Sequence, residues 1–199
     1  MEQPPQKLLL ARHAETGEEY YGRFVGSSDI GLGPNGPRQA LELAEKAAAY
    51  NPAIIYTSPL QRARYTAEIV GRKIGAQVIV RDDLREVDFG RWELRSFAEI
   101  AKGDAELVKR WSVWSPDFTF PEGERVGDFL HRVRLVTDDI VASGNDSVLV
   151  IAHGGVVRAM LCHCLRLAPE HYLLFDAQPA RLTRIDMFNE GGVLKGFNV

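Results

Sequence analysis

The apolar residues of this chain fall into two patterns that alternate along its length. Short, almost continuous apolar runs are typical of strands covered on both faces, and longer segments with apolar residues every three or four positions are typical of helices. The predicted strands are residues 7–12 (KLLLAR), 53–57 (AIIYT), 77–81 (QVIVR) and 147–152 (SVLVIA). The predicted helices lie near residues 35–50, 59–74, 95–113, 124–143 and 154–167. This alternation predicts an α/β protein with a parallel sheet covered on both faces.

Local signals support several of these boundaries. Ser58-Pro59 supplies an N-cap hydroxyl followed by proline at a first helical position, and Asn35 precedes an alanine-rich helix. Near residues 171–198, LTRIDMF and GGVLKGFNV predict two strands around a Glu-Gly-Gly turn. The chain has no linker, internal repeat or low-complexity tract, so one domain over residues 1–199 is expected.

Composition and charge limit the choice of partners. The chain of 199 residues is 45% hydrophobic and 26% charged, with a net charge of −3. No general attraction to nucleic acid or an anionic membrane follows from this charge, so any phosphate affinity must come from a few placed cations. The start MEQPPQK lacks the pattern of a signal peptide, and no apolar run approaches the roughly 20 residues of a membrane helix. A cytoplasmic protein is therefore expected.

The two cysteines, Cys162 and Cys164, flank a histidine in an apolar stretch. A metal site is one interpretation of this triplet. The stretch is predicted to be helical, however, and helical neighbours one and two positions apart point away from each other. Structural cysteines are therefore favoured over a metal site, and nothing supports a disulfide.

The candidate chemistry lies at the predicted strand ends, because ligands of open α/β sheets bind beyond the carboxyl ends of the strands. The first strand ends in Arg12-His13, and the second leads into a helix that carries Arg62. A cation near a helix N-terminus is disfavoured by roughly 0.3–1 kcal/mol. Arg62 is therefore either extended into solvent or balanced by a bound anion, and Arg64 is a competing candidate.

The last buried strand ends in His153 followed by Gly154-Gly155. A glycine pair lets a ligand approach the backbone closely, but it also makes an ordinary tight turn. The histidine alone is compatible with a structural role as well as a functional one.

A possible proton donor lies in the acidic stretch 81–93 (RDDLREVDFGRWE). Dense acidic loops are usually solvated surface, and spacing alone does not choose among the five carboxylates. Leu84, Val87 and Phe89 predict that part of the loop is anchored on the core, which would hold one carboxylate rigidly enough for proton transfer. The carboxylates are Asp82, Asp83, Glu86, Asp88 and Glu93.

Several segments together resemble the histidine phosphatase superfamily, the phosphoglycerate-mutase-like proteins. RHAET resembles its RHG signature, and YTSPLQRARYTAEI, LREVDFGRWE, FPEGERVGDFLHRV and VLVIAHGGVVRAM resemble its later segments in family order. The resemblance spans nearly the whole chain. It implies a three-layer α/β/α sandwich with a mostly parallel central sheet.

The resemblance also implies roles for individual residues. His13 matches the nucleophile that forms a phosphohistidine, Glu86 the proton donor and His153 the second pocket histidine. Phosphate-binding positions match Arg12, Arg62, Thr16 and Gly154. We expect the second ring nitrogen of His13 to donate to a backbone carbonyl, and the arginines to oppose protonation of its free nitrogen. No metal and no cofactor are implied.

Four positions depart from the family pattern. Ala14 and Leu94 replace usual glycines, Glu19 stands where asparagine is common, and Arg125 replaces a serine. We expect Arg125 and Glu19 to lie at the mouth of the substrate pocket, with Arg125 contacting the substrate.

The implied activity is a metal-independent phosphatase acting on a small phosphorylated metabolite. The acid loop and the length most resemble α-ribazole phosphatase, which acts late in cobalamin assembly, and related broad-range phosphatases. A cofactor-dependent phosphoglycerate mutase and a catalytically silent module that binds a phosphorylated ligand are the alternatives. Monomer and homodimer both stay open.

Overall fold

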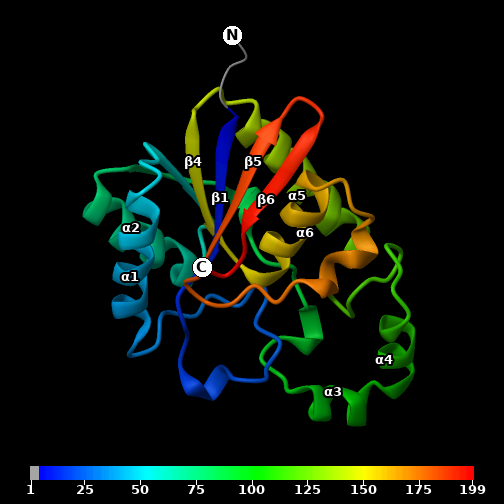
Figure 1. Ribbon diagram of the computed structural model, residues 1–199. Coiled ribbons are helices and arrows are strands. Elements are labelled where there is room, and N and C mark those ends of the chain that lie inside the picture. The colour runs from blue at the N-terminus through cyan, green and yellow to red at the C-terminus, as the bar shows by residue number, and fades with distance from the viewer. Residues whose placement is uncertain (1–4) are drawn as a thin grey trace.

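A computed structural model of the protein describes residues 5–199. Its centre is a six-stranded sheet in the order β3-β2-β4-β1-β5-β6 (Figure 1). The strands are β1 (Gln6–Arg12), β2 (Ile54–Thr57), β3 (Gln77–Val80), β4 (Ser147–Ala152), β5 (Leu182–Phe188) and β6 (Gly191–Gly196). The first four pair in parallel, whereas β5 is antiparallel to β1 and β6 to β5. The predicted mostly parallel sheet and the terminal strand pair are confirmed.

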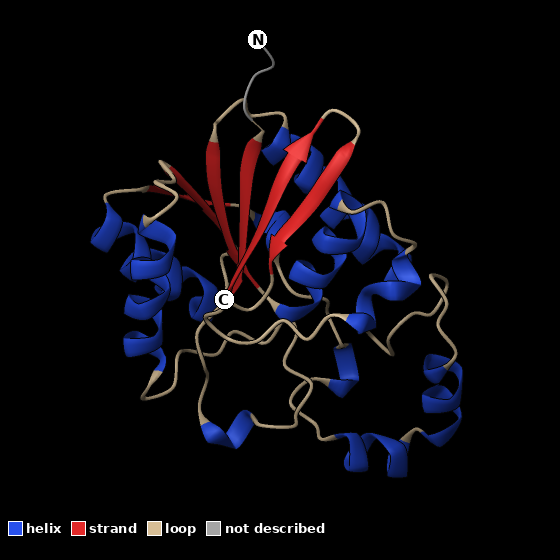
Figure 2. Cartoon of the chain, viewed as in Figure 1, coloured by secondary structure: helices blue, strands red, loops and turns tan. Residues whose placement is uncertain are grey.

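Two helix layers enclose this sheet (Figure 2). The enclosing helices are α1 (Gly36–Ala48) and α2 (Gln61–Ile74) on one face, and α5 (Val126–Val141) and α6 (Gly154–Cys164) on the other. Leu8 and Leu10 of β1 join the apolar cluster under α5 and α6. Leu9 and Ala11 join the cluster under α1 and α2. Because successive strand residues face opposite layers, a doubly covered strand needs an unbroken apolar run.

The predicted helix at residues 95–113 is two helices, α3 (Phe97–Gly103) and α4 (Ala105–Ser112). They lie away from the sheet, beyond the strand ends (Figure 1). Asp104 between them has a non-helical backbone (φ −129°, ψ 40°). Its carboxylate accepts hydrogen bonds from Trp92 Nε1 at 2.8 Å and Arg91 Nη2 at 2.7 Å. These long-range contacts fix the break.

The start of α2 also differs from the prediction. The helix begins at Gln61, and Ser58 Oγ accepts a hydrogen bond from Leu60 N at 3.2 Å. Ser58 therefore stabilises the turn before the helix and is not its N-cap. Short 3-10 helices complete the fold at Glu18–Tyr20, Asp82–Leu84, Gly90–Trp92 and Pro169–Leu174.

The last residues of the chain are tied back to the sheet edge. Val199 exchanges backbone hydrogen bonds with Leu182 at the start of β5. The Asn198 side chain donates to Asp176 O at 2.7 Å and accepts from Gln178 N at 3.1 Å. The segment around residue 177 is thus fixed by residues that follow β6.

The longest helix, α5, has 16 residues. Within residues 5–199, no helix combines the length and the apolar character that crossing a membrane requires.

Candidate active site

The ends of three parallel strands bring the predicted site residues to one edge of the sheet. Arg12, the last residue of β1, lies opposite Ala152, the last residue of β4, and β2 ends at the same level. His13 and His153 directly follow β1 and β4. Their ring centroids lie 5.3 Å apart. The expected convergence of distant segments is therefore present.

His13 is held in one orientation by its own backbone. Its side chain is buried, with 5% exposure, and Nδ1 lies 2.7 Å from Ala14 O. A carbonyl oxygen only accepts hydrogen bonds, so Nδ1 carries the proton and Nε2 keeps a free lone pair. The prediction that one nitrogen donates to a backbone carbonyl is confirmed.

The surroundings of His13 keep its ring neutral. Burial lowers the pKa of His13 well below 6.5, and the positive charges of Arg12 and Arg62 lower this pKa further. The expected effect of the arginines is present, although burial is the larger cause. A neutral imidazole with an available Nε2 is suited to nucleophilic attack.

Arg62 is the second residue of α2 and is almost completely buried, with 1% exposure. Its Nη1 donates to Ser28 O at 2.7 Å and its Nη2 to Gly26 O at 2.6 Å. Burial lowers the pKa of Arg62 to about 10. The alternative of an arginine extended into solvent is therefore excluded, and Arg64 is paired instead with Glu68 on the surface.

Several buried nitrogen atoms at this edge have no hydrogen-bond partner among residues 5–199. They are Arg12 Nε, Arg62 Nε, Arg158 Nε and both ring nitrogens of His153. An unsatisfied buried polar group costs about 1–3 kcal/mol. Burial lowers the pKa of His153 well below 6.5, and the positive charge of Arg62 lowers this pKa further. An oxyanion at this place would supply acceptors to these arginines and favour the protonated form of His153.

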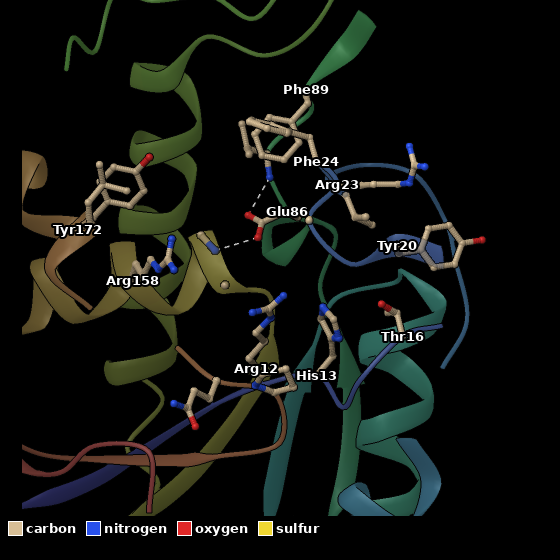
Figure 3. A pocket seen from close by; sticks show the side chains of 18 of the residues that line it. Arg12, His13, Thr16, Tyr20, Arg23, Phe24, Glu86, Phe89, Arg158 and Tyr172 are labelled. Carbon is tan, nitrogen blue, oxygen red and sulfur yellow. Dashed lines mark hydrogen bonds between the residues drawn. The ribbon is translucent and has the colours of Figure 1, made fainter. Parts of the chain in front are cut away.

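Glu86 lies across the cavity from Arg12 and His13 (Figure 3). Its side chain is buried, and its carboxylate accepts hydrogen bonds from Val87 N at 3.0 Å and Gly155 N at 2.8 Å. Phe89 and Val87 anchor the loop in the core beside it. The predicted anchoring of the acid loop is confirmed.

The cavity has a volume of about 790 Å³ and combines a cationic floor with an apolar wall. Five predicted residues line it, namely Arg12, His13, Thr16, Glu86 and Gly154. Arg62 and His153 are buried beside His13. The apolar wall is formed by Phe24, Phe89, Trp111, Phe129 and Leu130.

The sequence reasoning did not find Arg158 and Tyr172, which also line the cavity (Figure 3). Arg158 lies one turn beyond Gly154 on α6 and so faces the same side as the helix start. This helical spacing from Gly154 is the feature of the sequence that could have indicated Arg158 as a site residue. Tyr172 comes from a 3-10 helix that the apolar pattern did not predict.

Two predicted residues are not among those that line the cavity. Arg125 does not line the cavity, because its guanidinium is paired with Asp117 at 3.0 Å and Asp128 at 2.9 Å on the surface. Glu19 is exposed in the first 3-10 helix and also lies outside the lining. Its backbone oxygen accepts from Arg23 Nε at 2.8 Å. The expected contact of Arg125 with the substrate is therefore wrong, whereas the place of Glu19 at the pocket mouth stays a prediction.

The other two departures are accommodated differently. Ala14 is completely buried in the cluster under α1 and α2, and its N donates to Thr66 Oγ1 at 3.1 Å. Its φ is not among the positive values, so the methyl group causes no backbone strain. Leu94 has a φ of 60°, in the left-handed region that favours glycine.

Cys162 and Cys164 lie on α6 as predicted, both buried and unpaired. Burial raises the pKa of Cys162 to about 11 and that of Cys164 to about 12. Within residues 5–199, no group of three or more histidine, cysteine or acidic side chains has an arrangement suited to a metal ion.

Fold and site together define a phosphate-processing enzyme of the α/β class, and residues 8–199 match the histidine phosphatase superfamily, branch 1. The chain belongs to this superfamily, and its class is that of a phosphatase. The phosphoglycerate-mutase-like fold expected from the sequence is confirmed.

Individual relatives carry several substrate names. Phosphoserine phosphatase 1 of Hydrogenobacter thermophilus is 29% identical over 97% of this chain and 92% of that protein. Glucosyl-3-phosphoglycerate phosphatase of Mycobacterium tuberculosis is 32% identical over 81% of this chain and 76% of that protein. A bifunctional protein of M. tuberculosis is 39% identical over 79% of this chain, which spans 43% of that protein.

Among solved structures, the α-ribazole phosphatase of Shigella flexneri superposes with a TM-score of 0.88. The alignment covers 98% of this chain and 96% of that chain at 25% identity.

Proposed function

We propose that this protein is a metal-independent phosphatase that hydrolyses a phosphomonoester through a phosphohistidine on His13. The observation that carries the proposal is the set of buried, unpartnered nitrogens around a neutral imidazole whose Nε2 is free. Phosphoryl transfer requires an aligned nucleophile and positive charge around the equatorial oxygens. Arg12, Arg62 and His153 supply those charges and hydrogen-bond donors.

In the first step, His13 Nε2 attacks phosphorus and a nitrogen–phosphorus bond forms as the ester phosphorus–oxygen bond breaks. The departing alkoxide takes a proton from the Glu86 carboxyl group and leaves as the alcohol. Thr16 and the Gly154 amide at the start of α6 contact the phosphoryl oxygens, because helix N-termini bind anions. The dianion stabilises a protonated His153 in this state.

In the second step, a water molecule attacks phosphorus and gives a proton to the Glu86 carboxylate. The nitrogen–phosphorus bond breaks, its electron pair returns to His13 Nε2, and inorganic phosphate leaves. One ester and one water thus yield one alcohol and one phosphate, and both catalytic side chains return to their starting states.

For the substrate we propose α-ribazole 5′-phosphate, with related phosphomonoesters that carry an aromatic or apolar group. The aromatic wall of the cavity suits an aromatic base better than the small, charged body of phosphoserine. The high TM-score with the S. flexneri enzyme supports the same choice. Cobalamin assembly and the cytoplasm are the corresponding proposed setting.

Phosphorus NMR tests the intermediate. Protein quenched during turnover is expected to show an acid-labile phosphoramidate in the wild type and none in His13→Ala. Persistence of the signal in His13→Ala would exclude His13 as the nucleophile. A wild type that binds the ester but neither forms the phosphoramidate nor releases phosphate would be a silent binding module.

A phosphate-release screen tests the substrate. We expect the highest kcat/KM with α-ribazole 5′-phosphate, compared with phosphoserine, sugar phosphates, nucleotides and 3-phosphoglycerate. Incubation with 3-phosphoglycerate and trace bisphosphoglycerate provides the contrast with a mutase. Isomer formation without phosphate release would reject the phosphatase.

A further inference from the structure

Arg132 on α5 lies behind the loop that carries Glu86. Its Nη1 donates to Asp83 O at 3.0 Å and to Arg85 O at 2.7 Å, and its Nη2 donates to Glu86 O at 3.1 Å. One guanidinium thus binds three backbone carbonyls within four residues. This arrangement fixes the path of the backbone up to the residue whose side chain enters the cavity.

Glu124, in the FPEGER segment, holds Arg132 in turn. Its carboxylate accepts from Arg132 Nε at 2.7 Å and from Arg132 Nη2 at 2.9 Å, a two-point ion pair. The same residue binds the acid loop directly, because Glu124 N donates to Asp88 O at 2.9 Å and Asp88 N donates to a Glu124 oxygen at 3.3 Å. The FPEGER segment therefore supports the acid loop on both sides of Glu86.

We propose that Arg132, held by Glu124, is a positioning residue that keeps the Glu86 carboxyl group in line for proton transfer to the leaving group. The inference rests on the proposed function of Glu86. General acid catalysis contributes about 10²–10⁴ in rate and depends on placement within hydrogen-bond reach. Arg132 does not line the cavity. Its guanidinium lies over the ring of Phe129 in the cavity wall, and its hydrogen bonds reach the site through the backbone at Glu86.

A second set of contacts supports the phosphate-binding side, and Glu93, its central residue, also accepts from Phe89 N of the acid loop at 3.0 Å. Glu93 accepts backbone hydrogen bonds from Gly26 N at 3.1 Å, Ser27 N at 2.9 Å and Ser28 N at 3.2 Å. The carbonyls of Gly26 and Ser28 accept from the Arg62 guanidinium. We infer that Glu93 is a positioning residue for Arg62, acting through the loop at residues 26–28.

The two proposals predict different kinetic patterns, one selective for the leaving group and one common to all phosphate ligands. Displacement of Glu86 slows esters whose leaving group needs a proton, such as alkyl phosphates, and spares p-nitrophenyl phosphate, whose leaving group is stable as an anion. Displacement of Arg62 weakens binding of the phosphoryl group itself, so every ester and inorganic phosphate are affected alike.

The first experiment compares first-turnover rates of Arg132→Met on an alkyl phosphate and on p-nitrophenyl phosphate. We expect a loss of about 10- to 100-fold on the alkyl ester and less than about threefold on the aryl ester. Glu86→Gln should give the same pattern, and Arg132→Lys should recover part of the loss. Arg134→Met, an exposed arginine on the same helix, is the matched control and should resemble the wild type.

The ratio of the two rates is independent of the fraction of folded protein, so partial misfolding does not obscure the result. If Arg132→Met does not fold, Glu124→Gln replaces it with the same expected ratio. Equal losses on both esters would overturn the role of Arg132. If Glu86→Gln itself left the ratio unchanged, the proposed proton donor would fail, and the positioning role with it.

The second experiment measures inhibition by inorganic phosphate. Glu93→Gln keeps the size of the side chain but places an amide NH₂ against backbone donors, and we expect the inhibition constant to rise about tenfold or more. The alkyl-to-aryl rate ratio should change much less than in Arg132→Met, because, among residues 5–199, the Glu93 carboxylate binds the acid loop only at Phe89 N. Glu106→Gln, exposed on α4, is the control. An unchanged inhibition constant in Glu93→Gln would overturn this second role.

Discussion

At the scale of single residues, Gly154 and Gly155 are neighbours with different constraints. A Cβ at Gly155 would lie 2.5 Å from Glu86 Oε1, closer than real contacts allow. A Cβ at Gly154 would meet Arg12 no closer than 3.7 Å, which is ordinary van der Waals contact. The second glycine therefore lets the backbone of α6 approach the Glu86 carboxylate.

This difference predicts the behaviour of two alanine variants. Gly155→Ala displaces Glu86 and breaks its 2.8 Å hydrogen bond from Gly155 N, so we expect kcat for an alkyl phosphate to fall about tenfold or more. Gly154→Ala should instead raise the KM, because its Cβ would lie beside Arg12 in the phosphate-binding part of the cavity, and should leave kcat within about threefold of the wild type. Steady-state phosphate release checks both, and equal losses would contradict the assigned contact.

Residues also mark where sequence reasoning succeeded and where it stopped. Arg12, His13 and His153 were predictable, because strand ends of a parallel sheet meet at one edge. The failure at Arg125 has a physical reason, since two nearby aspartates bind its guanidinium on the surface. The contacts of Arg132 depend on how α5 packs behind the acid loop, and no local pattern encodes that packing.

At the scale of elements, Leu94 shows strain where a loop turns toward α3. Its φ of 60° costs a residue with a side chain roughly 1–2 kcal/mol. The turn is kept because Leu94 N donates to Phe24 O at 2.7 Å and Leu94 O accepts from Arg23 Nη1 at 2.9 Å. The hydrogen bonds hold the loop beside Phe24, which is part of the cavity wall.

The strain predicts an inverted order of stability. Glycine normally destabilises an ordered segment by about 0.5–1 kcal/mol relative to alanine. At this position we expect Leu94→Gly to exceed Leu94→Ala in unfolding free energy by about 1 kcal/mol, because only glycine removes the left-handed strain. Urea unfolding of the two variants checks the order. Leu94→Ala as the more stable variant would show that the turn is relaxed.

The prediction of one continuous helix over residues 95–113 is wrong, and the reason lies in contacts between elements. Its apolar spacing continues across the break, but Asp104 is drawn out of helical geometry by Trp92 and Arg91. Those partners come from the preceding 3-10 helix at Gly90–Trp92. A pattern within one segment cannot report a competing contact from another.

At the scale of the whole molecule, the two buried histidines of the site make the folded protein less stable in acid. His13 and His153 are both buried with pKa values well below 6.5, whereas in the unfolded chain they titrate near 6.5. Below that pH the unfolded state binds more protons than the folded state. Stability therefore falls as pH drops below about 6.5, by up to about 1.4 kcal/mol per pH unit for each histidine.

Urea unfolding between pH 7 and pH 5 measures this dependence. The double variant His13→Gln, His153→Gln should lose less stability over this range than the wild type, and each single variant should be intermediate. Saturating inorganic phosphate should reduce the loss in the wild type, because the bound anion favours protonated His153. Parallel curves for wild type and double variant would refute the assignment to these histidines.

The closing residues of the chain have a practical consequence for protein engineering. Asn198 and Val199 fasten the stretch around Ala177, whose carbonyl accepts a hydrogen bond from Arg12 Nη1 at 3.3 Å. Removing Asn198 and Val199 would therefore loosen the backbone that holds the guanidinium of Arg12 at the end of β1. A truncated protein would therefore lose activity through a displaced Arg12, although no residue that lines the cavity had been removed.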